Sequence, residues 1–196
     1  ANRSLQDGGA ISIGGASLKM ENSTFVSNTA NRNGGAIEIG ALNATLANLT
    51  LSLNTADNDD DGVGFGGGIV QQNDGSSILV SNALIAGNGA KGNAFEDCDG
   101  SFISDGYNLI GVDTGCNGFD SGVNGDQVGT ALSPVDPLLL PLADNGGPTP
   151  TMALQPTSSA IAGGNPSGCE DADGAPLLVD QRGQPRPRPV GTPCDI

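Results

Sequence analysis

The hexapeptide Gly8-Gly9-Ala10-Ile11-Ser12-Ile13 recurs twice further along the chain, and this repetition indicates the architecture. It returns as Gly-Gly-Ala-Ile-Glu-Ile at residues 34–39 and as Gly-Gly-Gly-Ile-Val-Gln at residues 66–71. The copies start 26 and 32 positions apart. Recurrence at a spacing of this size is typical of stacked repeats.

A second motif recurs at nearly the same spacing. Asn-Ser-Thr-Phe-Val-Ser-Asn-Thr-Ala at residues 22–30 has related copies at residues 48–56 and 82–90, with offsets of 26 and 34. Within each repeat, apolar residues alternate with small polar ones, as in Ile11 and Ile13, which is the two-residue period of a strand with one buried face. A unit this short cannot bury its own apolar face, so neighbouring repeats must stack.

Identical residues that recur in identical order favour parallel stacking, in which Ile11 lies beneath Ile37 and Ile69. We therefore predict an all-β parallel β-helix, a solenoid of repeats. The Gly-Gly pairs would supply the positive φ or the close backbone approach of a sharp corner. The same stacking aligns amide side chains that can hydrogen-bond along the axis as a ladder, as identical amides do in cross-β stacks. These side chains are Asn28, Asn54 and Asn88.

Proline marks a boundary in the chain. All twelve prolines lie between Pro134 and Pro193, and central strands exclude proline because it lacks a ladder donor. We predict parallel coils over residues 1–130, including a cysteine-bounded transition from about residue 96. A proline-rich, irregular segment over 131–196 would follow, with its apolar stretches at 138–142 and 177–179 packed on the coils as a cap.

The charge balance restricts the partners. Seven basic and 22 acidic residues give a net charge of -15, which repels nucleic acid and anionic lipid, so we expect neither nucleic-acid binding nor membrane insertion. No apolar run is long enough to span a bilayer. Because no signal segment precedes Ala1, we expect a mature or excised piece.

Four cysteines indicate disulfides rather than a metal site, because their spacings fit no metal-binding or redox motif. Three pairings are possible, and the sequential one is favoured because each pair closes a Gly/Asp-rich segment. Disulfides point to an oxidising compartment. The favoured pairs are Cys98 with Cys116 and Cys169 with Cys194.

One loop resembles a metal site. Asp57, Asp59 and Asp61 place carboxylates at alternate positions before Gly62, like the first half of a calcium loop, although Gly68 stands where a bidentate Glu is expected. Calcium is the cofactor that this loop predicts, a solvated acidic loop is the alternative, and the sequence indicates no required cofactor.

Catalysis is not expected. The chain has no His for proton transfer near neutral pH. Paired carboxylates such as Asp97 and Asp99 are interpreted as turn formers. Arg182, Arg186 and Arg188 are interpreted as surface or turn residues of a proline-rich stretch.

The repeats resemble those of bacterial right-handed parallel β-helix surface proteins, including the polymorphic outer-membrane and adhesin-like proteins. The C-terminal half resembles the tail of choice-of-anchor Q proteins. The motifs are Gly-Tyr-Asn-Leu-Ile-Gly at 106–111, Asp-Asn-Gly-Gly-Pro-Thr-Pro-Thr at 144–151 and Asp-Gln-Arg-Gly at 180–183. The resemblance implies a right-handed helix and an extracellular or cell-surface location, with the second cysteine pair stapling the tail.

The function expected from these features is structural or adhesive, without catalysis. Because the chain opens on a repeat, we expect an open first coil whose unpaired strand edge is a template for strand addition. Another copy joined head to tail there would build an extracellular filament. Expected partners are copies of the chain or other surface proteins. The alternative is a glycan-binding or polysaccharide-degrading β-helix.

Overall fold

The computed structural model describes residues 1–40, 43–73, 75–92, 97–186 and 192–196. Over these ranges the protein is all-β, without a helix, and its named strands pair in parallel. The predicted all-β, parallel class is therefore confirmed. None of the described residues belongs to a helix that could cross a membrane.

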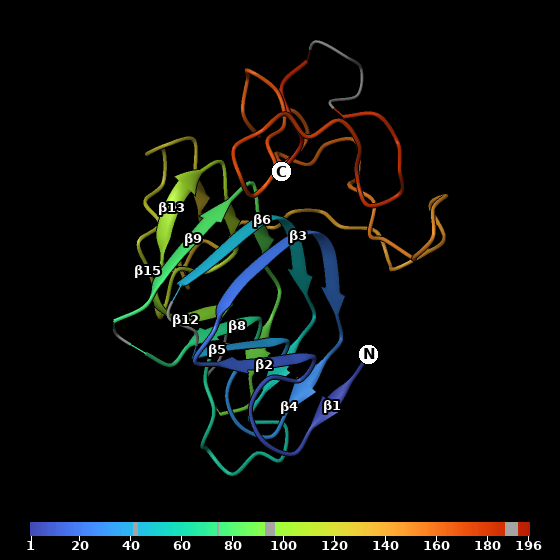
Figure 1. Ribbon diagram of the computed structural model, residues 1–196. Coiled ribbons are helices and arrows are strands. Elements are labelled where there is room, and N and C mark those ends of the chain that lie inside the picture. The colour runs from blue at the N-terminus through green and yellow to red at the C-terminus, as the bar shows by residue number, and fades with distance from the viewer. Residues whose placement is uncertain (41–42, 74, 93–96, 187–191) are drawn as a thin grey trace.

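The strands form three sheets, and the first repeats of the chain, up to β11 (Gly89–Ala90), add strands to each sheet in turn, whereas the later strands extend only two of the sheets. Figure 1 shows β2, β5, β8 and β12 lying one above another. The four-stranded sheet consists of β1 (Arg3–Ser4), β4 (Thr29–Ala30), β7 (Thr55–Ala56) and β11 (Gly89–Ala90). The five-stranded sheet consists of β2 (Ile11–Gly14), β5 (Ile37–Gly40), β8 (Ile69–Gln71), β12 (Cys98–Ser101) and β15 (Cys116–Asn117). The seven-stranded sheet consists of β3 (Ser17–Val26), β6 (Asn43–Ser52), β9 (Ser77–Ser81), β10 (Leu84–Ile85), β13 (Ile103–Gly106), β14 (Leu109–Ile110) and β16 (Gln127–Val128).

The registers put equivalent residues of successive repeats side by side. Ile11 pairs with Ile37, and Ile37 pairs with Ile69, as the sequence predicts. Ile37 and Ile69 are fully buried, and they belong to one continuous core. Because equivalent apolar side chains lie side by side on neighbouring strands, this continuous core extends from repeat to repeat along the stack.

Left-handed residues turn the chain at the corners. Gly34 has φ 65°, and a Cβ on the following residue, Gly35, would lie 2.1 Å from the Gly67 carbonyl oxygen. The Gly-Gly pair therefore meets both requirements, a left-handed turn and a close backbone approach. Asn22 and Asn48 are also left-handed, at φ 47° and 55°, and their positions bend β3 and β6, which curls the seven-stranded sheet.

Two disulfides, Cys98–Cys116 and Cys169–Cys194, join the sequential pairs favoured by the sequence. Cys98 and Cys116 are buried on neighbouring strands β12 and β15, so the first disulfide continues the apolar core. The second closes a loop within the C-terminal segment.

The C-terminal segment, residues 131–196, contains no strand among its described residues and pairs through isolated antiparallel bridges. Figure 1 shows it (orange to red) outside the sheets and above β3 and β6. It packs on the flank of the repetitive body, residues 1–130, where Leu139 and Leu154 contact buried Leu84 and Leu109.

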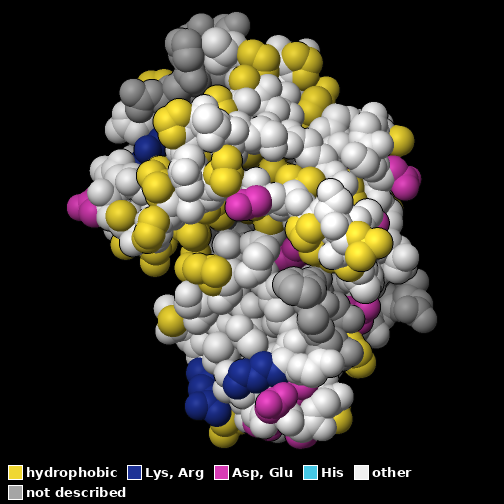
Figure 2. All heavy atoms as spheres, turned by 180° about the vertical axis from the view of Figure 1, so that it is seen from behind, with side chains coloured by type: hydrophobic (Ala, Val, Ile, Leu, Met, Phe, Trp, Pro, Cys, Tyr) yellow, Lys and Arg dark blue, Asp and Glu magenta, His cyan; other side chains and the backbone are white. Residues whose placement is uncertain are grey.

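The predicted packing of both apolar stretches of this segment is only half right. Leu178 is 71% exposed, in a stretch whose backbone pairs with itself: the Leu178 carbonyl accepts the N–H of Arg186 at 2.9 Å. Leu140, Leu142 and Val179 are also exposed. Figure 2 shows hydrophobic side chains gathered over the upper part of the surface, where this segment lies.

Candidate functional site

The acidic loop brings its three carboxylates together. One carboxylate oxygen each from Asp57, Asp59 and Asp61 lies within 4.8 Å of the others. Asp57 is buried, and its two oxygens accept the backbone N–H groups of Asp61 (3.1 Å) and Gly62 (3.2 Å), whereas Asp59 and Asp61 are exposed. Oxygen ligands in this arrangement suit a hard divalent cation. Asp57 also serves the loop itself, because its carboxylate satisfies two backbone donors.

The amides at the predicted ladder positions hydrogen-bond from repeat to repeat. The backbone N–H and the Nδ2 of Asn28 both donate to Oδ1 of Asn54, at 2.9 Å each. The same two donors of Asn54 reach Oδ1 of Asn88 at 3.0 and 2.8 Å. Asn2 extends the series at its first end by donating to Asn28. Every rung therefore satisfies one backbone and one side-chain donor with a single oxygen.

Asp97 ends this ladder. Its Oδ1 accepts the N–H and the Nδ2 of Asn88 at 2.7 and 3.0 Å, and its Oδ2 accepts the N–H of Val112 at 2.9 Å. Burial raises the pKa of Asp97 to about 6, although the hydrogen bonds from Asn88 and Val112 oppose the shift. The interpretation of Asp97 as a turn former is therefore incomplete, because its side chain is 2% exposed and caps the ladder.

A second carboxylate plays the same part. Asp126 Oδ1 accepts the N–H and the Nδ2 of Asn108, at 2.8 and 3.1 Å. Sequence reasoning missed both caps, because neither Asp lies in register with the repeats. The side-chain chemistry could have indicated these caps, because the last position of an amide ladder needs only an acceptor, and an ionised carboxylate is one.

A groove of about 310 Å³ separates the repetitive body from the C-terminal segment. Its body wall carries the corner amides Asn22, Asn48 and Asn82, which occupy the same place on three successive repeats. We call the whole groove the flank groove. It also includes Thr24, Leu84, Leu139, Thr151, Met152, Leu154, Asp180, Gln181, Arg182, Arg186 and Asp195.

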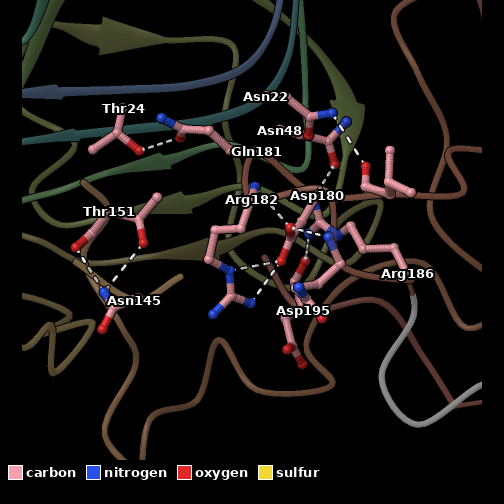
Figure 3. A network of polar contacts seen from close by, with 12 residues as sticks. Asn22, Thr24, Asn48, Asn145, Thr151, Asp180, Gln181, Arg182, Arg186 and Asp195 are labelled. Atoms are coloured by element: carbon pink, nitrogen blue, oxygen red, sulfur yellow. Dashed lines mark hydrogen bonds and ion pairs between the residues drawn. The ribbon is translucent and has the colours of Figure 1, made fainter. Parts of the chain in front are cut away.

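Polar contacts tie the two walls of the flank groove together (Figure 3). Thr24 Oγ1 donates to Gln181 Oε1 at 2.6 Å, and Asn22 Nδ2 donates to the carbonyl of Val179 at 3.3 Å. Beyond the groove, Lys19 pairs with Asp173. The segment is therefore positioned by side chains of β3 and of its neighbours.

The two described arginines of the segment differ in their partners. Arg182 donates through Nε and Nη2 to the Asp180 carboxylate, at 2.9 and 2.6 Å. Arg186 donates instead to Asn48 Oδ1 (3.1 Å) and to the backbone carbonyl of Asp195 (2.7 Å). Among the described residues, no carboxylate lies within ion-pair distance of Arg186.

Arg186 is thus a half-buried cation with neutral partners. Burial lowers its pKa, while the charges of Asp195 and Asp180 act in the opposite direction. The interpretation of Arg186 as a surface or turn residue is incomplete, because its guanidinium also joins Asn48 of the body to Asp195 of the segment across the groove (Figure 3). Arg188 lies outside the described residues.

Asn82 adds a polar atom without a partner. Its Nδ2 donates to Asn48 Oδ1 (3.1 Å) and to the Asp195 carbonyl (2.8 Å). Its Oδ1 is buried and accepts no hydrogen bond from the described residues. A buried amide oxygen in this state favours a donor from solvent or from a ligand.

Comparisons with known proteins give no relative for this chain: no family model, no curated protein and no solved structure matches it.

Proposed function

We propose that this chain is a non-catalytic, adhesive, right-handed parallel β-helix module of the bacterial cell exterior, belonging to the surface-protein group that its repeats resemble. In this proposal the stacked repeats are a rigid support and the flank groove is the contact surface. Parallel pairing in every named sheet and a continuous column of core side chains support the β-helix part.

One observation carries the adhesive role: the repeat itself places Asn22, Asn48 and Asn82 at one wall of a groove. Amides donate and accept hydrogen bonds, as a hydroxyl-rich ligand requires. The volume lies at the lower end of the range for ligand sites, which suits one or two sugar units. The groove is therefore suited to a saccharide.

The carboxylates of the groove argue against glycoside cleavage. A glycosidase keeps one carboxyl protonated as the general acid. Burial by itself would raise the pKa of Asp180, but hydrogen bonds from Arg182 and Gln184 lower it overall. The Asp195 carboxylate accepts the N–H of Ala162 at 2.7 Å. Both groups are engaged as structural acceptors.

The disulfides support a location outside the cytoplasm. Both disulfides are compatible with an oxidising compartment.

A saccharide array probed with the full chain tests the adhesive function. We expect retention on a defined set of saccharides, and about a tenfold loss for Asn22→Gly, which keeps the left-handed backbone but removes the amide. Asn43→Ala, an exposed amide elsewhere on the body, is the control and should bind as the wild type does. Absence of retention on every saccharide would overturn the proposal.

Head-to-tail assembly is the second candidate, and the first repeat favours it. Ile11 and Ile13 are half-buried, whereas Ile37 and Ile39, one repeat further in, are fully buried. Sedimentation over a hundredfold range of concentration, with electron microscopy at the highest, tests it. Filaments support assembly, and monomers at every concentration exclude it.

A further inference from the structure

We infer that the flank groove binds a saccharide that carries a single carboxylate, such as a uronic acid, with Arg186 receiving that carboxylate. The inference rests on the proposed adhesive function and names its ligand class.

The first step is the state of the Arg186 side chain. A guanidinium has five N–H donors, and the contacts to Asn48 and Asp195 occupy two of its nitrogens. Withdrawing a cation from water is costly unless an anion compensates for it. Arg186 is half-buried and its hydrogen-bond partners are neutral. The carboxylates of Asp180 and Asp195 act on it only from beyond ion-pair distance, so a ligand carboxylate would be its first direct anionic contact.

The second step is that the neighbouring carboxylates are already engaged. Asp180 receives two hydrogen bonds from Arg182, and Asp195 receives the N–H of Ala162. Moving either carboxylate to Arg186 would break these contacts. A ligand carboxylate avoids that loss, and it can form the two-pronged contact that suits a guanidinium.

The third step is the rest of the lining, which favours a sugar over a simple carboxylic acid. Asn22, Thr24 and Gln181 offer amide and hydroxyl groups. The buried Oδ1 of Asn82 accepts no hydrogen bond from the described residues, and a ligand hydroxyl could donate one to it. Leu139 and Leu154 form an apolar patch for the less polar face of a sugar ring.

The fourth step limits the ligand to one negative charge. The protein carries a net charge of -15, which repels a polyanionic chain over long distances. The groove has room for one or two sugar units. A neutral glycan with one acidic sugar satisfies both conditions.

The test is a matched pair of small ligands, methyl β-D-glucuronide and methyl β-D-glucoside, which differ only at C6: a carboxylate in the first and a hydroxymethyl group in the second. Chemical-shift titration of the full chain reports both affinity and location through the side-chain amides of Asn22 and Asn48. We expect the glucuronide to bind about tenfold more tightly, which is the value of a charge-assisted hydrogen bond. Sodium acetate, as a third probe, should bind weakly, because it lacks the hydroxyls.

Variants assign the preference to one side chain. Arg186→Gln should remove the difference between the two sugars, and Arg186→Lys should retain part of it, because the charge remains. Lys91→Gln removes an exposed cation outside the groove and should change nothing. Thermal unfolding shows whether each variant is folded, and Arg186→Lys serves as the test if Arg186→Gln is not.

The outcomes separate this inference from the proposed function. Equal binding of the two sugars would overturn the inference and leave an adhesive groove for neutral saccharides. A preference that survives in Arg186→Gln would also overturn it. If neither sugar binds, the inference fails, and the array decides the adhesive function independently. Tight binding of acetate alone would identify a general carboxylate site instead.

Discussion

The repetitive body and the C-terminal segment solve the same problem, satisfying polar backbone groups, in opposite ways. The body uses parallel strands and amide ladders between residues far apart in the chain, such as Asn54 and Asn88. The segment uses local turns in which an Asx side chain accepts the N–H two residues ahead. These turns begin at Asp136, Asp144, Asn165, Asp171 and Asp180.

The two regions should therefore respond differently to mutation. In the body, one residue supports the repeats on both sides of it, so damage should spread along the stack. In the segment, each turn satisfies its own backbone, and the one disulfide closes a loop within the segment. The connection to the body depends on a few side chains. We therefore expect global effects from changes in the body and local effects from changes in the segment.

The largest effect should come from a single methyl group in the body. In Gly35→Ala, the Cβ would lie 2.1 Å from the Gly67 oxygen and 2.5 Å from the Thr55 backbone, so whole repeats must separate. We expect a loss of about 3 kcal/mol or more in the free energy of unfolding. Gly14→Ala, in open space, should stay within about 0.5 kcal/mol of the wild type. Urea unfolding of both variants measures the contrast, and equal stabilities would refute the stacking argument.

Acid should affect the two regions in opposite directions. The pKa of Asp97 is raised from 3.8 to about 6, so its stabilising contribution is complete below pH 3.8 and is lost as the pH rises through 6. The loss is about 3 kcal/mol at most. The pKa of Asp180 is lowered, so its contribution is present above pH 3.8 and is lost as the pH falls through its folded value.

Amide hydrogen exchange, read separately for the two regions after correction for the intrinsic exchange rate, checks this pH dependence. Protection of the body should rise on going from pH 7 to pH 4, and protection of the segment should fall below pH 4. Asp97→Asn should flatten the body's response between pH 4 and pH 6. A response that is unchanged in Asp97→Asn would assign it to other groups, such as Asp126 and Asp99, whose pKa values are also raised by burial.

Removing the second disulfide should loosen only the segment. In Cys169→Ser/Cys194→Ser, we expect a loss of about 2 kcal/mol, confined to residues 131–196, because the body keeps its own disulfide and core. Limited proteolysis followed by mass spectrometry should show cleavage within the segment and an intact body. Simultaneous cleavage of both regions would mean that they unfold as one unit.

The smallest effect should be that of calcium on the acidic loop. At 1 mM calcium and a dissociation constant of the same order, the gain is about 0.4 kcal/mol. A rise in the unfolding temperature of about 1–2 °C follows. The double variant Asp59→Asn/Asp61→Asn should abolish the rise while keeping Asp57, which the loop itself needs. A rise that persists in this variant would exclude the loop as the site.

The sequence predicts the body well because the repeat fixes its register. Ile11, Ile37 and Ile69 could be aligned by inspection, and so could the three ladder amides. The caps Asp97 and Asp126 could not be aligned in this way, because they do not follow the repeat period. Their role shows only in the folded chain, where each accepts hydrogen bonds from the last amide of a ladder.

The flank groove was beyond sequence reasoning for a different reason. Asn48 and Arg186 are 138 residues apart, and no periodicity relates them. The corner amides recur visibly, but what faces them depends on how an irregular chain folds back. Leu178 is exposed for the same reason: in a proline-rich segment without a repeat, the sequence does not indicate which leucine faces the body.

The direction of the amide ladder has a consequence for how such proteins change length. Asn2, Asn28, Asn54 and Asn88 each donate to the next member, and Asn28, Asn54 and Asn88 also accept from the one before. A gene duplication of residues 28–53 would therefore insert a member that fits both neighbours. The Asp97 carboxylate accepts but has no side-chain N–H to donate to a further member. Duplication can therefore lengthen this amide ladder at any interior repeat, whereas one acidic residue, Asp97, fixes where the ladder ends even though parallel strands continue beyond it.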